Sequence, residues 1–194
     1  MDQDKIKANI LMHALSHVAT EGWSAALLER AALEAEGDAS LGWRLFPRGP
    51  LEAIELWHKQ LDEEMEASLP SPEDLRVRER VKEGVKTRLL LMSPHRAAAK
   101  KTALYLAGPS HLGQGARLVY QTVNKIWYYA GDTSTDYNFY TKRALLAGVY
   151  GATFLYWLKD ESDQYENTWR FLDKRIEDIL TLPKLPSKIF RMFG

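Results

Sequence analysis

The chain contains no cysteine among its 194 residues. Disulfides and thiolate metal sites are therefore excluded, and the composition fits a reducing compartment. Long apolar runs are also missing. The uncharged segment 144–158 has 15 residues, fewer than the roughly 18 that a membrane-spanning helix needs. We therefore expect no helix of this chain to cross a membrane.

Catalytic signatures are absent as well. The sequence has no nucleophile elbow, phosphate-binding loop or dinucleotide fingerprint. Glu55 and His58 form the sole Glu-x-x-His, whereas a di-iron helical bundle needs two, with further carboxylates. His13 and His17 have the spacing of metal ligands on a helix, but no third ligand accompanies them. We predict a protein without catalytic residues and without a metal.

A targeting segment is not evident at the start of the chain. The first residues, from Asp2 to Lys7, carry charges of both signs and lead directly into a helical pattern. Hydrophobic residues make up 45% and charged residues 27%, as in an ordinary globular protein. These features are typical of a bacterial cytoplasmic protein or a mature organellar one.

The net charge of zero hides a division between the two parts of the chain. Residues 1–74 hold 15 Asp and Glu against 6 Lys and Arg, a net charge of −9. Residues 75–194 hold 11 acids and 20 bases, a net charge of +9. The densest basic part runs from Arg76 to Lys101. Such asymmetry concerns surfaces and partners rather than the fold.

What is present is a helical pattern along the whole chain, with no strand-like alternation. Gly22 and Gly37 are typical helix stops, and Ser24 is a typical helix cap. Prolines at positions 70 and 72 mark the clearest boundary. The predicted helices cover about residues 6–21, 25–36, 41–46, 51–69, 73–92, 95–106, 111–130, 136–159 and 162–181.

Residues 127–143 are the most informative stretch. Gly131 ends an apolar helical run, and the side-chain oxygens that follow it suit the start of another helix. Helix punctuation alone does not require the cluster of aromatic and basic residues there: Trp127, Tyr128, Phe139, Tyr140 and Arg143. Exposed aromatic and Arg side chains anchor protein–protein contacts. The alternative is that these aromatics fill the core.

Three sequence blocks resemble one known family: residues 130–136 (Ala-Gly-Asp-Thr-Ser-Thr-Asp), 140–143 (Tyr-Thr-Lys-Arg) and 168–172 (Thr-Trp-Arg-Phe-Leu). They are similar to the ninth Coq protein of ubiquinone biosynthesis, a family with mitochondrial members and bacterial relatives. The resemblance covers about residues 75–180 well. It implies a fold like that of TetR transcription regulators, no enzymatic activity, lipid binding, and assistance to the hydroxylase that acts on demethoxyubiquinone.

We therefore predict an all-α, TetR-like fold with three parts. Residues 1–70 form a helix-turn-helix-type N-terminal region, 71–182 a helical lipid- and partner-binding region, and 183–194 an amphipathic tail. In TetR regulators the third helix enters the major groove of DNA. Here Arg44 and Arg48 face an excess of acidic residues, which DNA would repel. We expect no nucleic acid partner.

A lipid site is predicted in the second half of the chain. The resemblance implies lipid binding, and two predicted helices each present an apolar side there. Small residues between 144 and 152 would let another helix approach closely. The alternative is a core and dimer interface without a cavity. The candidate lipid-binding residues are Val85, Leu89, Met92, Val123, Ile126 and Trp127.

The partner surface follows from the resemblance, residue by residue. The positions that match the family's hydroxylase-binding surface are Asp132, Asp136, Phe139, Tyr140 and Arg143. Phe139 stands where the mitochondrial members usually have Trp, which keeps the ring and loses its N–H. Tyr140 and Arg143 lie one helical turn apart, so we expect them to share one exposed patch.

The tail presents apolar and basic residues on opposite sides of a helix, and no acid follows Asp178. Such a helix can lie on an anionic bilayer surface, and the resemblance implies the same contact. The alternative is a terminal helix docked on protein. The candidate membrane-contacting residues are Leu185, Lys188, Ile189, Phe190, Arg191 and Phe193.

The function that these observations favour is a non-enzymatic homodimer that presents a quinone intermediate to the demethoxyubiquinone hydroxylase. We expect no cofactor, but a bound lipid or isoprenoid quinone. In a bacterium it would be cytoplasmic and peripherally associated with the inner membrane; in an organelle it would lie on the mitochondrial matrix side. Two alternatives remain: a TetR-type ligand-sensing repressor and an enzyme of quinone metabolism.

Overall fold

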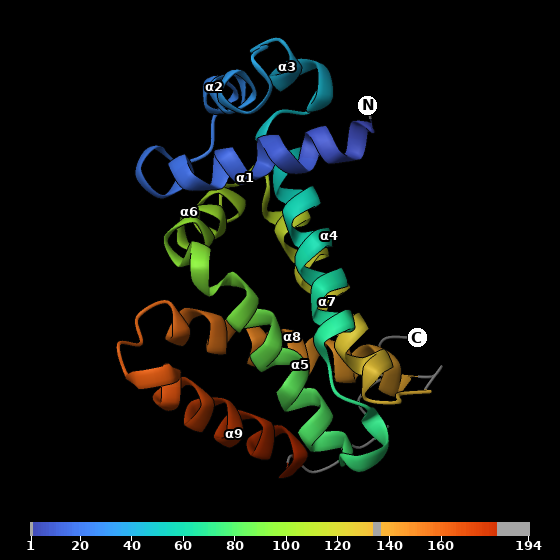
Figure 1. Ribbon diagram of the computed structural model, residues 1–194. Coiled ribbons are helices and arrows are strands. Elements are labelled where there is room, and N and C mark those ends of the chain that lie inside the picture. The colour runs from blue at the N-terminus through green and yellow to red at the C-terminus, as the bar shows by residue number, and fades with distance from the viewer. Residues whose placement is uncertain (1, 134–136, 182–194) are drawn as a thin grey trace. The chain divides into compact units, whose positions relative to one another are not determined.

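The computed structural model describes residues 2–133 and 137–181, and within them every regular element is a helix (Figure 1). The predicted all-α class is therefore confirmed. The α-helices are α1 (Gln3–Glu21), α2 (Ala25–Glu36), α3 (Leu41–Leu45), α4 (Pro50–Ser68), α5 (Val77–Met92), α6 (Arg96–Leu106), α7 (Leu112–Tyr129), α8 (Tyr137–Trp157) and α9 (Glu166–Thr181). Short 3-10 turns precede α5, α6 and α9: η1 (Pro72–Asp74), η2 (Ser93–His95) and η3 (Asp163–Tyr165).

Helix boundaries follow from the capping chemistry that the sequence indicates. The Ser24 hydroxyl accepts a hydrogen bond from Leu27 N at 3.1 Å, which starts α2. Gly37 ends α2 in the left-handed region, with a φ of 75° that glycine adopts without strain. Gly131, with a φ of 84°, follows α7 in the same way. The predicted stops and caps are confirmed at these positions.

Two predicted helices begin later than expected. The helix predicted from residue 73 starts at Val77, because Arg76 is extended and the Glu79 carboxylate accepts its backbone N–H at 2.8 Å. The helix predicted from residue 162 starts at Glu166, because Gln164 and Tyr165 have φ values of 50° and 58°. These left-handed residues interrupt the helical path.

The chain divides into two compact units, Met1–Thr133 and Ser134–Gly194. In the first unit α1 packs on α2 and α6, α3 packs on α2, and α4, α5 and α7 pack on one another. The second unit is built from α8 packed on α9. Figure 1 shows α4, α5 and α7 leading away from α1 within the first unit.

The first three helices form a close-packed group. A Cβ atom on Gly42 would lie 2.7 Å from the Glu29 backbone, so α3 can approach α2 this closely only with glycine there. The group is tied to α6, because Trp23 Nε1 donates a hydrogen bond to Thr102 Oγ1 at 2.8 Å inside the core. The main apolar residues between these helices are Ile10, Leu11, Leu15, Leu27, Leu28 and Ala31.

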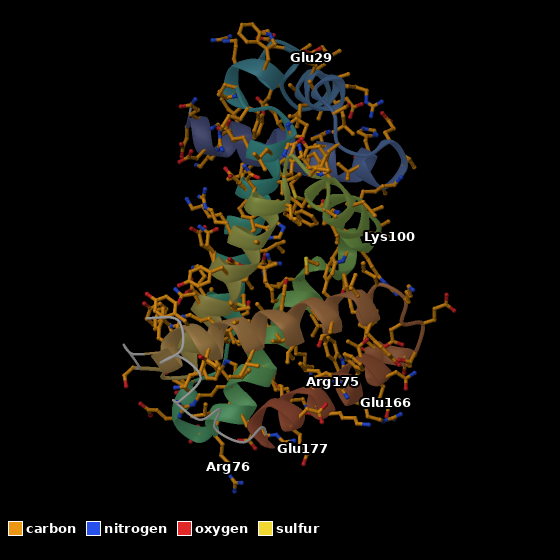
Figure 2. All side chains as sticks on the ribbon, turned by 180° about the vertical axis from the view of Figure 1, so that it is seen from behind. Glu29, Arg76, Lys100, Glu166, Arg175 and Glu177 are labelled. Carbon is orange, nitrogen blue, oxygen red and sulfur yellow. The ribbon has the colours of Figure 1, made fainter. Side chains whose placement is uncertain are left out.

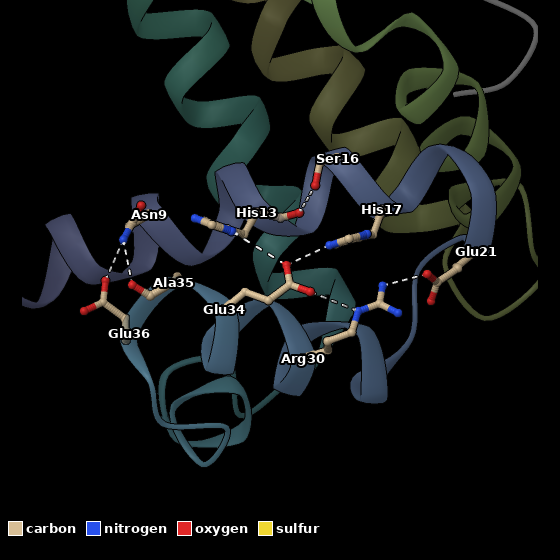
Figure 3. A network of polar contacts seen from close by, with 9 residues as sticks. All are labelled: Asn9, His13, Ser16, His17, Glu21, Arg30, Glu34, Ala35 and Glu36. Carbon is tan, nitrogen blue, oxygen red and sulfur yellow. Dashed lines mark hydrogen bonds and ion pairs between the residues drawn. The ribbon is translucent and has the colours of Figure 1, made fainter.

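A polar network on the surface fixes α1 against α2 (Figure 3). His17 Nε2 lies 2.7 Å from Glu34 Oε2, and His13 Nδ1 lies 3.7 Å from the same oxygen. Arg30 lies on the other side of Glu34 and also contacts Glu21 at 2.7 Å. The two histidines thus hold helices together. No group of three or more His, Cys, Asp and Glu side chains in residues 2–133 and 137–181 is placed to bind a metal ion.

Candidate partner and lipid sites

The candidate partner surface at the start of α8 has one exposed and one buried member. Tyr140 is 67% exposed, and its ring meets the Phe139 ring edge-on at 5.1 Å. Arg143 is only 1% exposed. Its guanidinium carbon lies 3.3 Å from the centre of the Phe139 ring, and its Nη1 donates to Phe139 O at 3.1 Å.

The expectation that Tyr140 and Arg143 share an exposed patch is therefore wrong for Arg143. The spacing is right, but a residue one turn away along a helix can still point inward. Arg143 instead stacks on Phe139, and this stacking fixes the ring against which Tyr140 stands. An arginine in this position orders the surface and does not offer its charge to a partner.

The remaining partner candidates lie elsewhere. Asp132 belongs to the first unit, is half-buried, and its backbone N–H donates to Trp127 O at 3.0 Å beyond the end of α7. Asp136 lies outside the described residues. Of the aromatics before Gly131, Trp127 is buried and Tyr128 is 62% exposed. The cluster thus contains both buried and exposed side chains, and for the exposed ones the partner interpretation stays a prediction.

An unpredicted arginine secures this end of α7. Arg80 of α5 donates from Nε to Leu75 O at 2.8 Å and from Nη1 to Ala130 O at 3.2 Å. These bonds satisfy two carbonyl groups that the adjoining helix ends leave without intrahelical partners. A lone arginine on a basic helix gives no sequence signal for this role.

The six candidate lipid-binding residues lie in the core of the first unit. Each of them, on α5 or α7, is 0–8% exposed. The two helices pack tightly, because a Cβ atom on Gly84 would lie 2.9 Å from Ile126 Cγ2. This placement is what the core interpretation of the sequence predicts. A lipid at these residues would have to separate α5 from α7.

A buried polar cluster joins α4, α5 and α7 beside these residues. Arg88 is completely buried, and its Nε donates to Asp62 Oδ1 at 2.6 Å. Thr122 Oγ1 donates to the same carboxylate at 2.9 Å. Arg88 Nη2 donates to His58 Nδ1 at 3.2 Å, and burial, followed by the Arg88 charge, lowers the pKa of His58 to about 3. His58 is therefore neutral.

This cluster escaped the sequence analysis although a signal exists. Arg88 stands at helical spacing between the apolar residues Val85 and Met92, on the buried side of α5. A charged residue at such a position needs a buried partner of opposite charge. Glu55 and His58, the sole Glu-x-x-His of the sequence, have different partners: Glu55 pairs with Arg48 at 2.5 Å, whereas His58 accepts from Arg88.

A cleft of about 480 Å³ opens on the first unit among α1, α4 and α7. Ten of its thirteen lining residues are polar or charged, and opposite charges pair across it, as Lys7 does with Glu52 at 3.2 Å and Arg117 with Glu55 at 4.0 Å. A polyprenyl chain favours apolar walls. The cleft is lined by Asp4, Lys7, Phe46, Glu52, Glu55, Leu56, Lys59, Asp62, Arg117, Leu118, Gln121, Asn124 and Lys125.

The block Thr168–Leu172 builds the turn between α8 and α9. Asp160 accepts hydrogen bonds from Thr168 N at 2.8 Å, Thr168 Oγ1 at 2.6 Å and Ser162 Oγ at 2.7 Å. Burial raises the pKa of Asp160, but these hydrogen bonds outweigh it and hold the pKa at about 2. Trp169 Nε1 donates to Gln164 O at 2.8 Å. Thr168 and Trp169 of the block thus stabilise this turn.

In the predicted helix-turn-helix-type region, both arginines considered for DNA contact stand beside carboxylates. Arg44 Nη1 lies 4.0 Å from Asp38, and Arg48 pairs with Glu55 and Glu52. Carboxylates thus accompany both arginines that could reach phosphates. Trp43 of α3 is 61% exposed, where a TetR regulator would meet the major groove.

Membrane contact was assigned to the tail, and its candidate residues lie outside the described residues. Among residues 2–133 and 137–181, no helix combines the length and apolar character needed to cross a membrane.

Comparison with known structures defines the class of the fold. The crystal structure of a TetR transcriptional regulator from Nitrosomonas europaea matches with a TM-score of 0.74 and 21% sequence identity. The match covers 90% of this chain and 97% of that chain. The predicted TetR-like fold is confirmed.

Sequence comparisons then confirm the family resemblance: the COQ9 family model matches residues 112–183. The mitochondrial ubiquinone biosynthesis protein COQ9 of Rattus norvegicus is 32% identical over 189 residues, covering 93% of this chain and 60% of the rat protein. The Homo sapiens protein of the same name is 30% identical, with coverage of 93% and 59%. The chain thus spans about three fifths of the length of these relatives.

Proposed function

We propose that this protein is a non-enzymatic accessory protein of ubiquinone biosynthesis. It binds a lipid, in our proposal an isoprenoid quinone intermediate, and presents it to the demethoxyubiquinone hydroxylase at a membrane surface. The single observation that carries the proposal is the similarity to COQ9 proteins over 93% of the chain. The exposed Tyr140, held in place by Phe139 and Arg143, supports a partner surface within the blocks that carry the resemblance.

A physical need underlies this role. A polyprenyl tail is insoluble in water because the transfer of each CH₂ group from water to an apolar environment is favourable by about 0.8 kcal/mol. The reactive ring lies near the headgroups of the bilayer. A protein that lifts the ring part-way out gives the hydroxylase access without extracting the whole tail.

The lipid contacts remain part of the proposal. We place the tail along α5 and α7, at Val85, Leu89, Met92, Val123, Ile126 and Trp127. These side chains are apolar and buried, and Ile126 packs directly on Gly84. Binding there requires α5 and α7 to move apart. Lipid binding in this mode should slow hydrogen exchange of both helices, because the lipid stabilises the bound state.

The hydroxylase assignment is tested with two proteins. Purified hydroxylase, with and without this protein, is given demethoxyubiquinone in vesicles, and the rate of product formation is measured. The proposal predicts that this protein alone forms no product and that its addition raises the hydroxylase rate. Turnover by this protein alone would favour the alternative, an enzyme of quinone metabolism.

A further inference from the structure

The first unit contains a long stretch without any acidic residue. No Asp or Glu occurs in residues 84–131, although acids make up 26 of the 194 residues of the chain. The stretch includes α6, the α6–α7 turn and α7. Its bases are Lys86, Arg88, Arg96, Lys100, Lys101, Arg117 and Lys125. Arg88 is buried, and carboxylates of α4 pair with Arg117 and Lys125. The positive charge that bears on the α6–α7 turn is that of Lys100 and Lys101.

The α6–α7 turn is held in a fixed shape. The rings of Tyr105 and His111 stack with centroids 4.5 Å apart and an interplanar angle of 11°. The backbone N–H of Gly108 donates to Tyr105 O, and that of His111 to Gly108 O at 2.9 Å. A Cβ atom on Gly115 would lie 3.2 Å from Leu106 Cβ, so the start of α7 lies close against the end of α6.

This turn exposes aliphatic side chains on both flanks. Leu104 is 63% exposed and Leu112 is 61% exposed, directly outside the stacked Tyr105 and His111. Ala107 and Pro109 between them are exposed as well. The opposite face of α6 is buried, through Ala98, Ala99, Thr102 and Leu106. The leucines therefore lie outside the core.

Two basic residues of α6 stand one turn before Leu104. Lys100 of α6 (Figure 2) is exposed and shares a face with Leu104, four residues on. Neither Lys100 nor the half-buried Lys101 forms an ion pair with any residue that the structure describes. On α1, which packs against α6, Glu21 pairs with Arg30 at 2.7 Å. Helix α6 itself contains no Asp or Glu, so no carboxylate of their own helix neutralises the two lysines.

We propose that the α6–α7 turn, with Lys100, Lys101, Leu104 and Leu112, docks on an anionic bilayer surface. The two leucines enter the headgroup region, and the two lysines meet anionic headgroups. Charge complementarity favours this occupant, and the exposed anchors are aliphatic rather than the aromatic and Arg side chains that dominate protein interfaces. The inference deepens the proposed function, because it supplies a membrane contact separate from the tail at 183–194.

Vesicle flotation of the full chain tests this contact. Vesicles of phosphatidylcholine alone are compared with vesicles that also contain phosphatidylglycerol. We expect Lys100→Glu/Lys101→Glu to weaken association with the anionic vesicles about tenfold or more. Leu104→Ser/Leu112→Ser should weaken it as well. The charge control is Lys59→Glu, an exposed change on α4, and the leucine control is Leu155→Ser, a residue of α8 that is also 61% exposed.

The absence of cysteine allows a direct measurement of insertion. Leu112→Cys gives a single site for a polarity-sensitive fluorophore, and Leu155→Cys gives the matched control. Anionic vesicles should shift the emission at position 112 to shorter wavelength and leave position 155 unchanged. Melting curves check that every variant folds. Unchanged flotation of both double variants, or no shift at position 112, overturns the proposal.

Failure of this inference and failure of the proposed function have different signatures. In a pull-down without membranes, the lysine and leucine variants should bind the hydroxylase as the wild type does. Loss of that binding would make the turn a protein contact and overturn the membrane assignment. If the wild type itself does not bind the hydroxylase, the proposed function fails, while flotation and fluorescence still decide the membrane contact.

Discussion

At the scale of single residues, two neighbouring members of the predicted partner surface differ in exposure. Tyr140 and Arg143 were both expected on one surface, yet Tyr140 is 67% exposed and Arg143 is buried over Phe139. The six lipid candidates are buried, and their lipid contact stays a prediction, because periodicity cannot separate a packed core from a lined cavity. The Arg88–Asp62 pair was missed because it depends on α4 and α5 meeting, which no local pattern encodes.

The exposed tyrosine should matter for binding and not for stability. Tyr140→Ala should weaken hydroxylase binding by roughly thirtyfold, equivalent to about 2 kcal/mol, if Tyr140 anchors the interface. The melting temperature should stay within a degree or two of the wild type, since little of the side chain is buried. Titration calorimetry and melting curves measure the two effects. Tyr120→Ala, an exposed tyrosine on α7, is the control, and equal binding by both variants would exclude Tyr140.

The buried arginine of the same motif should behave in the opposite way. Arg143→Glu replaces the guanidinium that stacks on the Phe139 ring and donates to the Phe139 carbonyl by a buried carboxylate, which can make neither contact. We expect a loss of about 3 kcal/mol or more in the free energy of unfolding, measured by urea denaturation. Binding should fall in parallel with stability. A stable Arg143→Glu protein would show that the stacking on Phe139 is unimportant.

The buried cluster should be a strong determinant of stability. Asp62→Ala leaves the Arg88 charge buried without its carboxylate, at a cost of about 3–5 kcal/mol. The double variant Asp62→Leu/Arg88→Met removes both charges and should be more stable than Asp62→Ala. Lys59→Ala breaks an exposed pair on the same helix and should cost less than about 1 kcal/mol. Similar urea midpoints for Asp62→Ala and Lys59→Ala would contradict the cluster's importance.

At the scale of helices, local chemistry predicted most boundaries. Ser24, Gly37 and Gly131 act as the caps and stops that their residue types suggest. The exceptions lie at α5 and α9. A left-handed Gln164 is not predictable from its residue type, since it depends on the Trp169 indole and on Asp160 holding the turn.

The Asp160 turn should make stability depend on acid. Its folded pKa of about 2 lies below the unfolded value of about 3.9, so its contribution is present above pH 4 and is lost as the pH falls toward 2. Between these pH values the wild type should lose more stability than Asp160→Asn, measured by urea unfolding. Asp163→Asn, an exposed acid of the same turn, should follow the wild type. Parallel curves for wild type and Asp160→Asn would refute the assignment.

At the scale of the whole molecule, the fold resembles that of DNA-binding regulators, whereas the charge of the first 74 residues is unfavourable for DNA binding. The fold is that of TetR regulators, as the TM-score of 0.74 shows. The first 74 residues carry a net charge of −9, and Arg44 and Arg48 are paired with carboxylates. The sequence predicted this conflict, because net charge needs no coordinates. It could not predict that Leu104 and Leu112 at the α6–α7 turn are exposed, because exposure depends on how the helices pack on one another.

DNA selection tests the charge argument. Rounds of selection from random duplexes should recover no sequence motif, because the phosphate contacts that dominate affinity are missing. A palindromic site bound with nanomolar affinity at physiological salt would instead support the repressor alternative.

The most direct test of the central claim is mass spectrometry of lipid carried by the native, full-length protein after gentle purification. The account predicts an isoprenoid quinone or one of its biosynthetic intermediates, enriched above its share of the membrane lipids. Protein that carries no lipid, or only lipids in the proportions of the membrane, would contradict the account.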